Sequence, residues 1–324
     1  MRQIPIEAID EAAQHVYQAA VRTPLVRLDL PFDGDRPVPE VYLKLESLQP
    51  IGSFKIRGAW NAVRQLLPSE LREGVWTVSA GNAAQGVAFA ARRAGTKCTV
   101  MVIETAPETK LRAIEKLGAT VVRASYDECW NTVESHASTR MHGHFVHPFD
   151  DDRFIAGNGT AGLEILEDLP DVDAVVGALG GGGLLAGVGT VLRARKPGVR
   201  IYAAEPETAA PLKLSLTKGE PCRFDAWQPS FVDGAGGKSV LPTMWPLLKD
   251  MVTDSIVMPL DAVASAMRHT AERVHVIAEG AAGTAIAAAL SGRCGQGKIV
   301  AIVSGGNIDL AKFAQVVGAV SADH

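Results

Sequence analysis

From about residue 75 onward, short runs of β-branched and other apolar residues alternate with longer segments whose apolar positions follow the period of an α-helix. The short runs predict strands at residues 75–78, 97–103, 120–122, 173–178, 199–204 and 298–303. The longer segments predict helices at residues 83–94, 127–141, 184–195 and 281–290, with another between Pro107 and Gly118. Strands that alternate with helices indicate mostly parallel sheets covered by helices on both faces.

Residues 75–147 contain four strands and three helices of their own. We therefore predict an α/β fold with two lobes, each a mostly parallel sheet flanked by helices. The sequence shows no internal repeat, low-complexity tract or charged tail that would indicate another architecture.

The composition narrows the class of protein. Of the 324 residues, 47% are hydrophobic and 21% are charged, as in soluble globular proteins, and a net charge of −4 gives no general attraction to nucleic acid or membrane. No apolar run is long enough to span a bilayer, and the N-terminus lacks the apolar core of a signal peptide. The four cysteines show no metal or redox spacing. We expect a cytoplasmic protein without nucleic-acid or membrane partners.

Lys55 lies in the segment Ser-Phe-Lys-Ile-Arg-Gly-Ala at residues 53–59, beside an aromatic ring and just ahead of a predicted helix. An isolated lysine is most simply a solvated surface residue. Here Gly52 and Ser53 indicate a turn, and Phe54 supplies a flat apolar face. A lysine that forms a Schiff base must be held near an aldehyde and kept partly neutral, and this neighbourhood suits that role.

Residues 79–86 form a loop of small residues between a strand and a helix. Backbone N–H groups at such a helix N-terminus suit an anion such as a carboxylate. A plain turn capped by Asn82 explains the same pattern equally well.

Residues 180–187 begin with four glycines, which lie after a buried strand and before a helix. Such a backbone can wrap around a phosphate. The segment is neither a Walker A motif, since no Lys-Ser/Thr pair follows, nor a clean dinucleotide fingerprint. The Ser-Gly-Gly-Asn loop at residues 304–307 follows the last strand, at the sheet edge where ligands bind in such folds, although a plain turn is an equal alternative.

Taken together and in this order, the four segments resemble the threonine dehydratase and serine racemase branch of the fold-type II pyridoxal phosphate enzymes, from Thr23 to Asn307. The resemblance implies a fold similar to the tryptophan synthase β subunit, pyridoxal 5'-phosphate as the cofactor, an amino acid substrate and a homodimer. It also implies a large cofactor-binding domain at residues 1–70 and 148–324, and a small mobile domain at residues 71–147 that carries the asparagine loop.

The resemblance further implies roles for individual residues. Lys55 binds the cofactor as a Schiff base and removes the Cα proton, Phe54 packs against the pyridine ring, and Asn82 bonds to the phenolic oxygen. The N–H donors to the phosphate are Gly180, Gly181, Gly182, Gly183 and Leu184. The residues that contact substrate are Ser79, Ala80, Gly81, Asn82 and Ala83. Ser304 faces the pyridine nitrogen, and because a serine does not hold that nitrogen protonated, the ring suits β-elimination better than transamination.

The reaction that the resemblance implies is an ammonia-lyase reaction. An L-3-hydroxy amino acid such as threonine or serine loses water and is then hydrolysed to a 2-oxo acid and ammonia. Ala80 stands where racemases of this branch have a serine base, which disfavours racemization. Ala83 replaces a common histidine and Trp130 an arginine, and we expect these two changes to fit a bulkier substrate such as 3-phenylserine.

No required metal is expected. Glu205 matches one ligand of the family's divalent-cation site and Ala209 could offer its carbonyl, but Pro211 stands where an acidic ligand is expected. A monovalent ion elsewhere stays open. We interpret His142, His144 and His147 as part of an ordinary loop. Asp150, Asp151 and Asp152 are interpreted as the start of a helix. Residues 231–237 and Glu279-Gly280 resemble segments that line the family's active site.

Three alternatives remain open at this stage. Within the same fold, the chain can be an amino acid racemase or a β-replacement enzyme. From a different class, the glycines can cradle NAD or ATP without chemistry at Lys55. A noncatalytic relative is disfavoured while Lys55 and all four loops are intact. The chain ends soon after Ser304, so we expect no C-terminal regulatory domain and no inhibition by an end-product amino acid.

Overall fold

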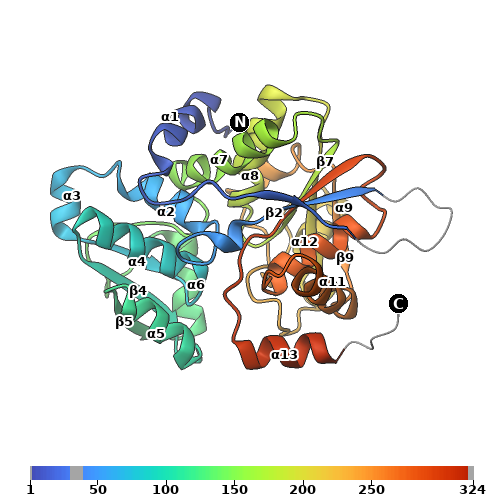
Figure 1. Cartoon of the computed structure of the whole chain (residues 1–324). Helices are drawn as coiled ribbons and strands as arrows, with labels where there is room; N and C mark the ends of the chain where they lie inside the picture. The colour runs from blue at the N-terminus through green and yellow to red at the C-terminus, as the bar shows by residue number, and fades with distance from the viewer. Residues whose placement is uncertain (1, 30–38, 320–324) are drawn as a thin grey trace.

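Two sheets organise the computed structural model, which describes residues 2–29 and 39–319 (Figure 1). The larger sheet has six strands, in the order β1 (Leu25–Arg27), β2 (Glu40–Lys44), β10 (Lys298–Ile302), β7 (Ala174–Ala178), β8 (Arg200–Pro206) and β9 (Asp254–Met258). Only β1 runs antiparallel to its neighbour, and all other pairs are parallel.

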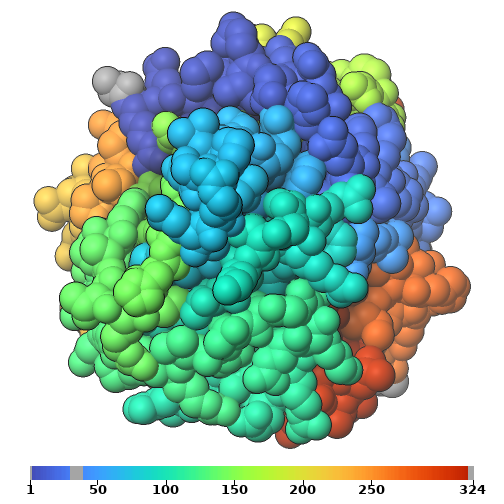
Figure 2. Space-filling model, turned by 90° about the vertical axis from the view of Figure 1, so that its left-hand side faces the viewer, coloured from blue at the N-terminus to red at the C-terminus, as the bar shows by residue number. Residues whose placement is uncertain are grey.

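The smaller sheet has four parallel strands, in the order β5 (Thr120–Ala124), β4 (Cys98–Ile103), β3 (Val75–Val78) and β6 (His144–Phe145). Its helices are α4 (Asn82–Ala94), α5 (Glu108–Lys116) and α6 (Tyr126–Ser135), and α3 (Pro68–Glu73) precedes them. In the space-filling view, which is turned by 90° from Figure 1, the green segments of the smaller sheet's lobe pack directly against blue N-terminal and red C-terminal segments (Figure 2). The predicted α/β fold with two mostly parallel sheets is confirmed, whereas the domain boundaries at residues 71 and 147 stay a prediction.

The larger sheet is covered by helices on both faces because its strands are apolar on both faces. Val175, Val300 and Ile302 belong to one buried cluster, which includes residues of α7 (Asp152–Asp168) and α8 (Gly183–Arg195). The alternate positions Val176 and Ile299 belong to another cluster, with residues of α11 (Leu260–Arg273) and α12 (Gly280–Leu290). Such continuous apolar runs are typical of parallel strands buried on two sides. The remaining helices are α1 (Ile6–Val16), the 3-10 turn η1 (Glu46–Leu48), α2 (Lys55–Val63), α9 (Pro211–Lys218), α10 (Trp245–Leu248) and α13 (Leu310–Gly318).

Helices α2 and α7 approach each other closely through two glycines. A Cβ atom at Gly58 would overlap the ring of Phe154, and one at Gly157 would overlap the carbonyl oxygen of Arg57. Neither glycine places a side chain between the two helices, so they pack this closely and α7 fixes the place of the helix that begins with Lys55.

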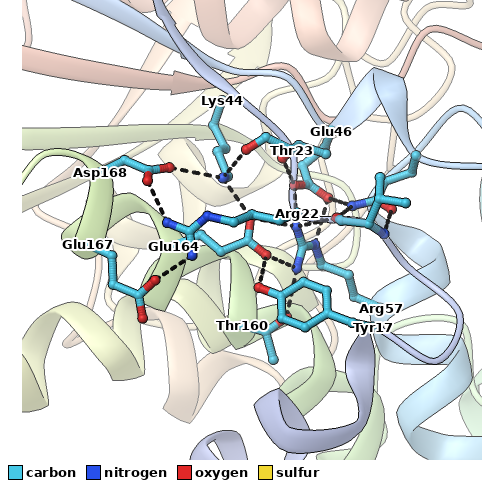
Figure 3. A network of polar contacts seen from close by, with 12 residues as sticks. Tyr17, Arg22, Thr23, Lys44, Glu46, Arg57, Thr160, Glu164, Glu167 and Asp168 are labelled. Carbon is cyan, nitrogen blue, oxygen red and sulfur yellow. Dashed lines mark hydrogen bonds and ion pairs between the residues drawn. The ribbon is translucent and has the colours of Figure 1, made fainter.

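A buried ionic network ties the same two helices to β2 and to η1 (Figure 3). The Arg57 guanidinium lies between two carboxylates, with Nε and Nη2 2.8 Å from Glu46 and Nη1 2.7 Å from Glu164. Lys44 Nζ lies 2.6 Å from Glu164 Oε2 and donates to the carbonyl of Thr23 at 2.7 Å. Burial alone would raise the pKa of Glu164, but the Arg57 guanidinium holds it below its usual range.

Most predicted elements agree with the observed ones to within one or two residues. The exception is the helix predicted at residues 127–141, which ends at Ser135 because His136 adopts a left-handed conformation with φ 57°. The predicted helix start at Asp150–Asp152 is confirmed, since the Asp151 side chain caps α7 by accepting the N–H of Phe154 at 3.0 Å.

No helix within residues 2–29 and 39–319 has both the length and the apolar character needed to cross a membrane.

Candidate active site

Lys55 is the first residue of α2, and its amine lies in a largely apolar setting. Its Nζ donates to the carbonyl oxygen of Pro148 at 2.5 Å and lies 5.2 Å and 5.3 Å from the ring centroids of Phe54 and Phe154. Burial lowers the pKa of Lys55 to about 8, although the Glu279 carboxylate acts in the opposite direction. About a tenth of this amine is therefore neutral and nucleophilic at pH 7, far more than for a lysine with the usual pKa.

The Ser304 loop lies directly beside the lysine segment. The N–H of Phe54 donates to the carbonyl of Ser304 at 3.0 Å, and Ser53 pairs with Gly305 in an antiparallel bridge. The side chain of Ser304 is buried, with 4% of its surface exposed. Two segments about 250 residues apart in sequence thus form one wall of the site.

The asparagine loop reaches this wall through the side chain of Asn82. Asn307 Nδ2 donates to Asn82 Oδ1 at 2.7 Å, and Asn82 Nδ2 donates to Glu279 Oε1 at 2.7 Å. The N-cap residue of α4 is Gly81, which has no side chain that could cap the helix, and Asn82 is the first residue of α4. The interpretation of Asn82 as the cap is therefore wrong. In the same loop Ser79 Oγ accepts the N–H of Gly81 at 3.1 Å.

The glycine loop between β7 and α8 has no room for side chains. A Cβ atom at Gly181 would overlap the Phe149 ring, and one at Gly183 would lie 2.7 Å from the Phe149 carbonyl. Gly182 is the N-cap of α8 and has a φ of 90°, which favours glycine. The first N–H groups of a helix have no partner within it, so Gly183 and Leu184 present donors at the positive end of the helix dipole.

The lysine segment and the glycine loop meet at Pro148 and Phe149, because Pro148 accepts the Lys55 amine while Phe149 packs on the glycine loop. A nucleophilic amine that lies near a backbone cradle for an anion fits a ligand that carries both an aldehyde and a phosphate. The residues present therefore fit pyridoxal phosphate: Lys55 can bind its aldehyde, and the N–H groups of Gly180–Gly183 and Leu184 can bind its phosphate.

Ala80 and Ala83 lie on the asparagine loop and the start of α4, whereas Trp130 lies on α6. Ala80 is half-buried and carries no group that can move a proton. Ala83 is buried within α4. Trp130 packs against the core from α6, and its indole N–H donates to Glu134, one turn further along, at 2.9 Å.

Glu205 has both carboxylate oxygens occupied by protein donors. It accepts the N–H groups of Leu212 and Lys213 at 2.8 Å each, and the hydroxyl of Ser255 at 2.6 Å. Burial raises the pKa of Glu205 to about 7. Pro211, which stands where the cation site would need an acidic ligand, is the first residue of α9. Glu205 therefore serves here as a hydrogen-bond acceptor for the start of that helix.

Among the described residues, His147 groups with His136 and Asp150, and not with His142 or His144. His147 Nδ1 accepts the N–H of Asp150 at 2.7 Å, while Nε2 lies 3.2 Å from the carbonyl of Val133. Both ring nitrogens are thus engaged by the protein, which leaves neither free for a metal ion.

Several residues around the site have no signal in the sequence. The Pro148 carbonyl and the rings of Phe149 and Phe154 belong to no motif. By contrast, the loop at residues 231–237, which the sequence predicts to line the site, approaches the glycine loop, since a Cβ at Gly180 would lie 2.5 Å from the Gly234 carbonyl. The smaller sheet's lobe contacts this loop through an ion pair between Lys110 and Asp233.

The sequence matches the family described as pyridoxal-phosphate dependent enzyme over residues 16–305. An L-threonine ammonia-lyase of Thermotoga maritima is 39% identical over 281 residues, which cover 86% of this chain and 70% of that protein. Human serine racemase is 37% identical over 279 residues, 83% of this chain and 82% of that protein. The solved structure of the processed form of threonine deaminase isoform 2 from Solanum lycopersicum has a TM-score of 0.83 at 30% identity, covering 97% of this chain and 92% of that one. The family match argues against the alternative of a nucleotide-binding protein without chemistry at Lys55.

Proposed function

The chain belongs to the family of pyridoxal-phosphate dependent enzymes, and on that basis we propose that it is an ammonia-lyase. The proposed reaction is the β-elimination of water from an L-3-hydroxy amino acid such as threonine or serine, which yields a 2-oxo acid and ammonia. The similarity to the threonine ammonia-lyase of Thermotoga maritima and to the tomato threonine deaminase supports this class of substrate.

The observation that carries the proposal is the setting of Lys55. Its Nζ lies 5.2 Å and 5.3 Å from the centroids of two aromatic rings, and burial lowers its pKa to about 8, so it can take a proton from a neighbouring carbon acid and return it. Pyridoxal phosphate, when bound, supplies the electron withdrawal that makes the Cα proton of an amino acid acidic. The carbonyl of Pro148 orients the amine before the cofactor and substrate bind.

The other residues bind and orient in this proposal. The N–H groups of Gly180–Gly183 and Leu184 would bind the phosphate of pyridoxal phosphate, Phe54 would pack against its ring, and Ser304 would lie at its nitrogen. Ser79 and the neighbouring amides of the asparagine loop bind the substrate carboxylate, and Asn82 donates to the cofactor. Ala80 offers no base on the opposite face, so a proton removed by Lys55 is not returned from the other side.

Amino acid racemization is the second candidate, because human serine racemase is 37% identical to the chain. For the finer substrate choice, we propose that a bulky β-substituent such as that of 3-phenylserine is accepted, with Ala83 and Trp130 as the supporting differences. We also propose a homodimer located in the cytoplasm.

The proposal is tested with purified protein and a panel of L-threonine, L-serine and threo-phenylserine. Formation of 2-oxo acid and ammonia without D-amino acid is expected, and Lys55→Ala is expected to lose the activity and the yellow colour of the bound cofactor. D-serine formed faster than 2-oxo acid would establish the racemase instead. A clear preference in kcat/KM for threonine would refute the phenylserine part.

A further inference from the structure

Glu279 places a carboxyl group inside the candidate site that the proposed reaction does not use. It is the N-cap residue of α12, and its Oε1 accepts from Asn82 Nδ2 at 2.7 Å. A Cβ atom at Gly305 would lie 2.6 Å from that oxygen, so the glycine of the Ser304 loop makes the space that the carboxyl group occupies. The contact therefore depends on three segments that the sequence separates widely.

The same contact determines how the Asn82 amide is turned. Asn307 Nδ2 donates to Asn82 Oδ1 at 2.7 Å. The orientation of the Asn307 amide is fixed in turn, because the same Nδ2 donates to the Ile51 carbonyl at 2.8 Å. Glu279 accepts one of the two Nδ2 hydrogens on the other side. An asparagine amide has two N–H donors, so a single N–H of Asn82 remains for a ligand.

Charged groups face Glu279 from three other elements. Lys55 lies on α2, Lys110 on α5 and Asp233 in the loop at residues 231–237. Burial raises the pKa of Glu279 to about 7, Asp233 adds to this effect, and the Asn82 bond, the Lys110 charge and the backbone N–H of Asn307 oppose it. In the reverse direction, the Glu279 carboxylate raises the pKa of Lys55 against the effect of burial. The two groups thus titrate close together, near neutral pH.

We propose that Glu279 is a positioning residue: it turns the Asn82 amide so that an N–H faces the cofactor, and its negative charge keeps a proton on Lys55. Asn307 completes the arrangement from the opposite side. The inference rests on the cofactor site of the proposed function and is independent of which amino acid the enzyme converts. A chain that captures pyridoxal phosphate but releases no ammonia would refute the proposed function and leave this inference to be judged by its own test.

The effect of the Glu279 charge on Lys55 is tested with the full-length chain, freed of cofactor. The measurement is the rate at which it captures added pyridoxal phosphate between pH 6 and 9. The neutral amine attacks the aldehyde, so the rate follows the neutral fraction of Lys55. Glu279→Gln is expected to move the midpoint of this profile down by about one pH unit, so that capture at pH 7 becomes several times faster. The control Glu115→Gln, the same change at an exposed position of α5, should follow the wild type. A Glu279→Gln profile that coincides with the wild type, or moves upward, would overturn the inference.

The orientation of Asn82 is tested by the dissociation constant for pyridoxal phosphate. Glu279→Ala removes the acceptor and is expected to weaken binding about tenfold, the effect of one lost hydrogen bond of roughly 1.4 kcal/mol. Glu279→Gln keeps an amide oxygen as acceptor and should bind more tightly than Glu279→Ala. Asn307→Ala should weaken binding like Glu279→Ala while leaving the pH midpoint unchanged, which a purely structural role of either residue would not produce. Wild-type affinity in both alanine variants would overturn the positioning role, and Asn307→Ala keeps the test decisive if Glu279→Ala does not fold.

Discussion

Replacement of Arg57 by methionine tests whether the buried ionic network holds the lysine-bearing helix in place (Figure 3). The guanidinium has no exposed surface and makes five hydrogen bonds to the side chains of Glu46, Glu164 and Thr160, at 2.7–3.1 Å. Methionine has a similar length and no charge, so the substitution removes the cation with little change in volume.

The expected loss follows from the charges that remain. Arg57 and Lys44 balance Glu46 and Glu164, so Arg57→Met leaves two buried carboxylates against the single cation of Lys44. Removal of one partner from a buried ion pair costs about 3–5 kcal/mol, because the other charge stays buried without compensation. At roughly 2–4 °C per kcal/mol, the melting temperature should fall by about 6–20 °C.

The assay is thermal unfolding followed by circular dichroism at fixed protein and cofactor concentrations. Arg195→Met is the matched control, since Arg195 pairs with Asp10 at 2.6 Å on the surface, and exposed pairs contribute only about 0–1 kcal/mol. The double variant Arg57→Met, Glu164→Gln again has equal numbers of buried positive and negative charges, one on Lys44 and one on Glu46. Its melting temperature should lie well above the value obtained by adding the two single losses.

Two results would refute this reasoning. One is an Arg57→Met variant that melts within about 2 °C of the Arg195→Met control. The other is a double variant whose loss equals the sum of the single losses, which would mean that the two charges do not interact in the folded protein.

Three further predictions concern the glycine loop, a buried carboxyl group and metal ions. Gly181→Ala should weaken pyridoxal phosphate binding about tenfold in a fluorescence titration, because its Cβ would overlap the Phe149 ring and displace the loop; wild-type affinity would contradict this. The carboxyl group of Glu205 keeps its proton up to about pH 7 in the folded chain but only up to 4.5 when unfolded. The free energy of unfolding should therefore fall as the pH rises from 4.5 to 7, by up to about 3 kcal/mol from this group. Glu205→Gln should remove that share in urea unfolding at pH 5 and pH 8, and an unchanged pH dependence would count against it. Chelation should leave the activity intact, since protein donors occupy both Glu205 oxygens; a loss that magnesium restores would show a required cation.

The features that the sequence predicts are those with local causes. The alternation of apolar runs and helical periods located β3, β4 and β5 of the smaller sheet and β7, β8 and β10 of the larger one, because a strand buried on two sides must be apolar throughout. It did not locate β1, β2 or β9. The setting of Lys55 and the four glycines before α8 are likewise visible in consecutive residues. The end of α6 was missed because His136 takes a left-handed conformation without being glycine, so the usual stop signal is absent.

The features that the sequence does not predict depend on contacts between distant residues. Asn82 appeared suited to cap α4, yet its amide bonds to Glu279 and Asn307, which lie 197 and 225 positions away. The two ionic partners of Arg57 lie 11 and 107 positions from it. The carbonyl of Pro148, 93 positions from Lys55, belongs to the backbone and leaves no trace in residue type. No periodicity or motif encodes such pairs, because each becomes possible only after the helices have packed.

The close contact of α2 and α7 also determines how the lysine can move. Because Gly58 and Gly157 leave no gap between the two backbones, the Cα atom of Lys55 cannot follow its amine as the amine changes partners. All of the travel must come from rotation about the four methylene groups of the side chain. The length of the Lys55 side chain alone therefore limits how far the reactive nitrogen can move, and the rings of Phe54 and Phe154 bound its path.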